Sequence, residues 1–152
     1  MKHSAAEYNV LSYLLQKKSI SYEKAIDWAY SQYTKEGVDP FVEKISLAYD
    51  QSEIIELISN DFQVYGEPTQ GFLIGETASM YSKEQLSLYA AIARILFDLD
   101  LGLSEEERQE LYIAEDYFGW HNHAEKEAVR HSLPIFNKYR PIYERAVAHF
   151  SV

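Results

Sequence analysis

The sequence of 152 residues contains no cysteine. This absence excludes disulfides, thiolate zinc sites and cysteine nucleophiles, and it is typical of a reducing compartment. A long uncharged apolar run is also missing, because the most apolar window, 86–103, carries Arg94, Asp98 and Asp100. We therefore expect no membrane span. The first residues lack the apolar core of a signal peptide, so we expect a cytoplasmic protein.

Positive charge is scarce. The chain has 14 Lys and Arg against 24 Asp and Glu, a net charge of −10. This balance argues against binding nucleic acid, whose phosphates would be repelled, and is compatible with a basic protein partner. Most of the excess negative charge lies in residues 98–116, where eight acidic residues and one basic residue give a net charge of −7.

What the sequence does contain is helical periodicity in a chain that is 47% hydrophobic. We predict an all-α protein with one domain, 1–152, built as a bundle or helical-hairpin array of seven to eight helices. A helix over about 82–101 is apolar on two faces, which predicts that it lies at the centre. Start signals stand at Ser4, at Ser21, at Asp39 followed by Pro40, and at Ser104, which begins a capping box with Glu107.

Glycine and proline predict interruptions elsewhere. Gly71 and Gly75 fall in residues 64–81, which we interpret as a long irregular connection between two helical halves. Pro134 and Pro141 are expected to interrupt the C-terminal helices.

Two stretches carry a resemblance to a known family. One is residues 19–29, continuing to 37–40; the other is residues 110–120, leading to Leu133 and Pro134. They resemble a bacterial family of small, helical proteins known only as a domain of unknown function. Small acidic proteins of this kind are similar in class to the immunity proteins that bacteria pair with secreted toxins. The resemblance implies a binding protein.

The acidic segment holds aromatic residues, which supply contact area in interfaces while negative charge speeds encounter with a basic partner. A solvated helix face is the competing interpretation of this segment. The predicted partner-binding residues are Asp100, Glu105, Glu106, Glu107, Glu110, Tyr112, Glu115, Asp116, Tyr117 and Trp120.

His123, Glu127 and His131 are spaced four apart, which places them on one helix face. Imidazole and carboxylate groups bind zinc or iron, but the outer histidines are separated by roughly 12 Å of helix rise. Only a pair of them, with Glu115 or Asp116, could therefore share one ion. A solvated face is the favoured interpretation, and we predict no cofactor and no catalytic residue.

The leading hypothesis is a small acidic binding protein, in its sharpest form an immunity protein that covers the basic active site of a nuclease-type toxin. The first alternative is a metal-dependent or acid/base enzyme that uses the His123, Glu127 and His131 face. The second alternative is a scaffold or adaptor.

Overall fold

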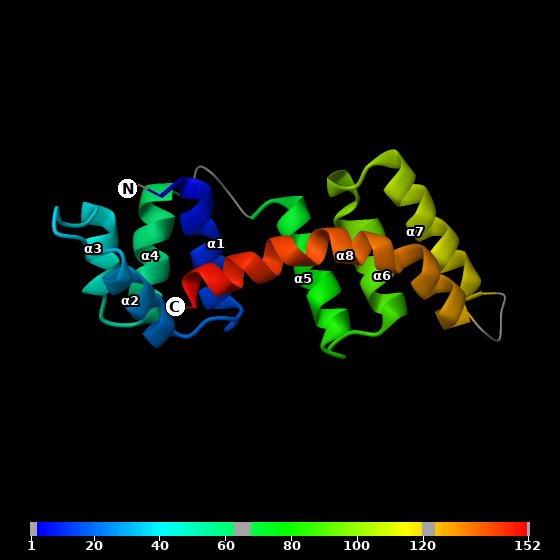
Figure 1. Ribbon diagram of the computed structural model, residues 1–152, viewed down its shortest axis with the longest axis horizontal. Coiled ribbons are helices and arrows are strands. Elements are labelled where there is room, and N and C mark those ends of the chain that lie inside the picture. The colour runs from blue at the N-terminus through cyan, green and yellow to red at the C-terminus, as the bar shows by residue number, and fades with distance from the viewer. Residues whose placement is uncertain (1–2, 63–67, 120–123, 152) are drawn as a thin grey trace. The chain divides into compact units, whose positions relative to one another are not determined.

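The computed structural model describes residues 3–62, 68–119 and 124–151 (Figure 1). Within these ranges the chain forms eight α-helices and one short 3₁₀ helix, and it forms no strand. The prediction of an all-α protein is confirmed. No helix in the described ranges combines the length and apolarity needed to cross a membrane.

The chain divides into two compact units. The first is Met1–Pro68 together with Ala146–Val152, and the second is Thr69–Arg145. Helix α8, Ala124–Phe150, contributes its last turns to the first unit and the rest to the second. One domain over the whole chain stays a prediction.

The first unit begins with four helices, and the starts of the first three follow from their capping residues. Ser4, Ser21 and Asp39 each accept a backbone N–H of the first turn with the side chain, as predicted. Pro40 follows Asp39 at the first helical position, where a proline loses no helical hydrogen bond. The helices are α1 (Ala5–Gln16), α2 (Tyr22–Ser31), α3 (Pro40–Ser46) and α4 (Gln51–Phe62).

Aromatic rings form much of the first unit's core. The Tyr8 ring stacks on Phe62 with centroids 4.9 Å apart and meets the edge of Phe41 at 4.7 Å. Trp28, only 1% exposed, meets Phe150 of α8 at 4.9 Å. The last turn of α8 is therefore part of this core.

The second unit consists of three helices, a 3₁₀ turn and most of α8. The elements are α5 (Gln70–Ser82), α6 (Leu88–Asp98), η2 (Asp100–Gly102) and α7 (Glu105–Tyr117). Helix α6 contacts both α5 and α7, and its buried residues Ile92 and Ile95 lie in one core cluster with residues of α5, α7 and α8. Burying one face of α6 thus assembles the unit.

The prediction of one helix over 82–101 is wrong at both ends, because α6 comprises only Leu88–Asp98. Ser82 is the last residue of α5, and a turn with Glu84 at φ +60° leads to Ser87. The Ser87 hydroxyl caps α6 by accepting the Ala90 N–H at 3.1 Å. Only one face of α6 is buried, since Phe97 is 64% exposed.

The predicted irregular connection over 64–81 is also wrong for its larger part, because 70–81 lie in α5; 63–67 are outside the described residues. The Thr69 hydroxyl caps α5 by accepting the Phe72 N–H at 3.2 Å. A Cβ atom on Gly75 would collide with the Tyr139 carbonyl oxygen of α8. Glycine here permits close helix packing instead of ending the helix.

Neither proline interrupts the C-terminal segment, because Pro134 and Pro141 both lie inside the continuous helix α8. Each proline leaves the carbonyl four residues earlier without its helical N–H partner. Those carbonyls belong to Arg130 and Asn137, which are exposed, so water can solvate them.

Candidate functional site

Helix α7 presents one side to the core and the other to solvent. The Ser104 hydroxyl accepts the Glu107 N–H at 3.2 Å, and the Glu107 carboxylate accepts the Ser104 N–H at 2.8 Å, so the predicted capping box begins the helix. Leu111 and Ala114 are fully buried. The exposed positions of the helix, here called the α7 surface, are Glu105, Glu106, Gln109, Glu110, Tyr112, Ile113 and Asp116.

Three of the predicted partner-binding carboxylates have a charged or titratable partner within the protein. The pairs are Glu105 with Arg108 (2.7 Å), Glu107 with Lys138 (2.8 Å) and Glu110 with His131 (2.7 Å). Exposed ion pairs contribute little stability and exchange easily with other partners. Glu105 and Glu110, whose side chains are 70% and 49% exposed, therefore remain accessible to another molecule.

Glu107 is different because its side chain is only 12% exposed. Its carboxylate also accepts the Tyr139 hydroxyl at 2.8 Å, and the same hydroxyl lies 3.0 Å from the Gly102 carbonyl oxygen. Burial raises the pKa of Glu107, but hydrogen bonds from Lys138, the Ser104 backbone and Tyr139 outweigh it and lower the pKa below the ordinary 4.5. The group holds α7 against α8 and offers little to a partner.

Glu106 and Asp116 are exposed and form no ion pair with any described residue. They lie ten residues apart on α7, about 15 Å along the helix axis at 1.5 Å per residue, so one is near each end of the α7 surface. Glu115 and Asp100 are half-buried. Glu106 and Asp116 are therefore the carboxylates of α7 that another molecule can pair with at least cost.

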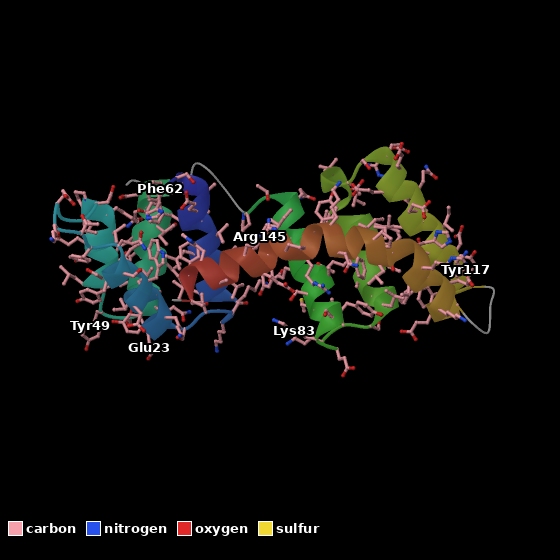
Figure 2. The ribbon with its side chains drawn as sticks, in the orientation of Figure 1. Glu23, Tyr49, Phe62, Lys83, Tyr117 and Arg145 are labelled. Atoms are coloured by element: carbon pink, nitrogen blue, oxygen red, sulfur yellow. The ribbon has the colours of Figure 1, made fainter. Side chains whose placement is uncertain are left out.

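The three aromatic residues predicted to bind a partner differ in how the structure describes their exposure. Tyr112 is 40% exposed on the α7 surface. Tyr117, labelled in Figure 2, is the last residue of α7 and is half-buried. Its ring stacks on the His131 ring with centroids 5.7 Å apart. Trp120 lies outside the described residues. Among the described residues, Tyr112 is therefore the one predicted aromatic residue that is exposed on the α7 surface.

Exposed apolar residues around the acidic segment were missed by the sequence analysis. Ile113 is 41% exposed beside Tyr112, and Leu101 in η2 is 83% exposed. Phe97, which lies within the helix predicted over 82–101 to be apolar on two faces, is exposed to solvent. The alternation of Phe97 and Leu101 with Asp98 and Asp100 was a usable signal of exposure, but helical periodicity favoured burying Phe97.

The alternative metal-binding face of His123, Glu127 and His131 is not assembled by the described residues. Glu127 binds Arg130 at 3.3 Å, one turn along the same helix. His131 binds Glu110 of α7. His123 lies outside the described residues. Glu127 and His131 thus have separate partners among the described residues.

A different histidine cluster occurs in the first unit, and the sequence analysis missed it. His3, Glu7 and His149 place one potential ligand atom each within 4.8 Å of one another. The spacing of His3 and Glu7, four residues apart across the start of α1, was a usable signal. Nothing in the sequence indicated that His149 would join them.

Neither a scan against protein-family models nor searches of curated proteins and of solved structures found a match.

Proposed function

We propose that this protein is a binding protein whose α7 surface docks a basic protein. The observation that carries the proposal is the composition of that surface, where Tyr112 and Ile113 are exposed and Glu106 and Asp116 lack ion-pair partners among the described residues. Apolar or aromatic anchors surrounded by charged residues are a recurring arrangement of protein interfaces.

Electrostatics supports a basic partner. The chain carries a net charge of −10, and residues 98–116 alone carry −7. Such a field increases the rate of encounter with positively charged molecules, and it disfavours nucleic acid. The carboxylates already paired with Arg108 or His131 can exchange those weak partners for arginines or lysines of another protein.

The finer form of the proposal is a cytoplasmic immunity protein that covers the basic active site of a nuclease-type toxin. It is supported by the acidic charge and by the likeness in class to immunity proteins. A protein that binds nucleic-acid phosphates needs a basic cleft, and an acidic helix with aromatic anchors is a suitable inhibitor of such a cleft.

The test is co-expression with the protein encoded by the adjacent gene. The finer proposal expects that protein to be basic, to be toxic when expressed alone, and to co-purify with this chain. Binding measured by calorimetry should weaken steeply as salt increases, because opposite charges meet in the interface. A toxic neighbour that does not co-purify contradicts the immunity role, and salt-independent binding contradicts the acidic interface.

The enzyme alternative gains no support from the described residues. Glu127 and His131, which it requires, are bound to Arg130 and Glu110. A scaffold or adaptor would use the same α7 surface and differs only in lacking a toxic partner.

A further inference from the structure

The cluster of His3, Glu7 and His149 contains an unusual hydrogen-bond geometry. His3 precedes the N-cap residue Ser4, and its side chain is only 5% exposed. Its Nδ1 atom lies 2.8 Å from Oε2 of Glu7. The other oxygen of Glu7, Oε1, accepts the Ser4 backbone N–H at 3.3 Å. Glu7 therefore uses one oxygen to cap α1 and directs the other at His3.

The other ring nitrogen of His3 has a partner whose orientation can be assigned. The amide nitrogen of Gln32 donates to the Ser31 hydroxyl oxygen at 3.0 Å, and that hydroxyl donates its own hydrogen to the Trp28 carbonyl at 2.6 Å. The Gln32 carbonyl oxygen is thus the atom that lies 3.1 Å from His3 Nε2. Since this oxygen only accepts, His3 Nε2 must carry a hydrogen.

With its hydrogen on Nε2, a neutral His3 presents a lone pair at Nδ1 to the carboxylate of Glu7. Two acceptors 2.8 Å apart require a positive species between or beside them, either a second proton or a metal ion.

His149 supplies a third potential ligand from the last turn of α8. Its ring lies 6.2 Å from the His3 ring, and its side chain belongs to an exposed residue. Helix C-termini favour positive charge, so the end of α8 suits a cation. The Trp28 ring packs against both histidines at 5.1 and 6.1 Å, and its buried N–H has no hydrogen-bond partner among the described residues.

We propose that His3 Nδ1, Glu7 Oε2 and His149 bind a divalent transition-metal ion of the zinc class. Two imidazoles and one carboxylate are a common zinc ligand set that leaves a fourth position for water. In tetrahedral geometry the ligand atoms lie about 3.3 Å apart. One potential ligand atom of each residue already lies within 4.8 Å of the other two, and rotation of the exposed side chains of Glu7 and His149 can bring the ligand atoms to the tetrahedral spacing.

Gln32 has the role of an orienting residue in this site. A histidine that binds a metal through one nitrogen almost always donates from the other nitrogen to a fixed acceptor, which sets the tautomer. The contact between His3 Nε2 and Gln32 provides this acceptor. The ion would join the beginning of α1 to the end of α8, and it would stabilise the first unit because the unfolded chain does not hold these ligands together.

The experiment is equilibrium dialysis of tag-free protein against Zn²⁺ at neutral pH, with bound zinc measured by mass spectrometry. We expect one zinc per chain and a higher unfolding temperature with zinc. His149→Gln and Glu7→Gln should each weaken zinc binding at least about tenfold, and Gln32→Ala about 10- to 100-fold. Circular dichroism checks that each variant is folded, and His149 is exposed enough to tolerate the change.

The matched control is His131→Gln, which removes a histidine that also pairs with a glutamate, at 2.7 Å, in the second unit. Its zinc affinity should equal that of the wild type. The proposal is overturned if the wild type binds no zinc. It is equally overturned if His149→Gln binds zinc as tightly as the wild type, because the ion would then lie elsewhere. The outcome is independent of the proposed docking function.

Discussion

Two glycines on one face of α5 give the sharpest test of how the second unit packs. A Cβ atom at Gly75 would collide with the Tyr139 carbonyl oxygen and lie 3.2 Å from the Tyr143 Cβ. A Cβ atom at Gly71, one turn earlier, would lie 3.7 Å from the Ile142 side chain, which is ordinary van der Waals contact. The same substitution to alanine should therefore have opposite effects at the two positions.

The magnitudes follow from two competing terms. Alanine is favoured over glycine in a helix by about 1 kcal/mol. At Gly71 nothing opposes this gain, so Gly71→Ala should stabilise the second unit by up to about 1 kcal/mol. At Gly75 the obstacle is backbone, which moves only if α8 moves, and overpacking of this kind costs about 1–3 kcal/mol or more. We expect Gly75→Ala to destabilise the unit by about 2 kcal/mol.

Urea unfolding followed by circular dichroism measures both variants. Because the chain has two compact units, hydrogen exchange of the α5 amides should show that the change lies in the second unit. A Gly75→Ala variant as stable as Gly71→Ala would refute the close contact between α5 and α8.

Three further substitutions test α7 and α8: two remove parts of the contact between these helices, and the third removes a proline from within α8. Tyr139→Phe removes the hydroxyl that lies 2.8 Å from Glu107 and 3.0 Å from the Gly102 carbonyl, and should cost about 1–2 kcal/mol in urea unfolding; no change would contradict these bonds. Glu107→Gln removes a carboxylate whose pKa is lowered in the folded state, so its charge stabilises the fold above about pH 4.5 and less as the pH falls. The free energies of unfolding of wild type and variant should therefore converge at low pH. A constant difference from pH 7 to about 3 would contradict the stabilising role of the Glu107 charge. Pro134→Ala restores a helical N–H at an exposed position of α8 and should stabilise the protein by about 1–2 kcal/mol, whereas destabilisation would indicate that the proline is needed.

Local signals made most helix starts predictable. Ser104 with Glu107, and Asp39 with Pro40, satisfy the first N–H groups of a helix through side chains a few residues away, so the sequence contains the whole interaction. The all-α class follows from the same short-range periodicity.

The errors arose where distant residues decide the structure. Gly75 suggested a loop until Tyr139, 64 residues later, explained why no side chain fits there. Pro134 suggested a break, yet the packing of α8 on three other helices outweighs the lost hydrogen bond. His149 joins His3 only because α8 ends in the first unit. The acidic segment was recognised from composition, but which carboxylates remain unpaired depended on Lys138 and His131 of another helix.

The most direct test of the docking proposal is the affinity of a charge-reversed α7 surface for the basic partner. Glu106→Lys with Asp116→Lys reverses both unpaired carboxylates, and the helix dipole disfavours the first change but favours the second, so stability should change little. The control, Asp27→Lys with Glu56→Lys, makes the same change of net charge at exposed positions of the first unit. We predict that the α7 variant binds at least about tenfold more weakly and associates more slowly, while the control changes affinity far less. Equal affinities of the two variants would contradict the assignment of the α7 surface as the binding site.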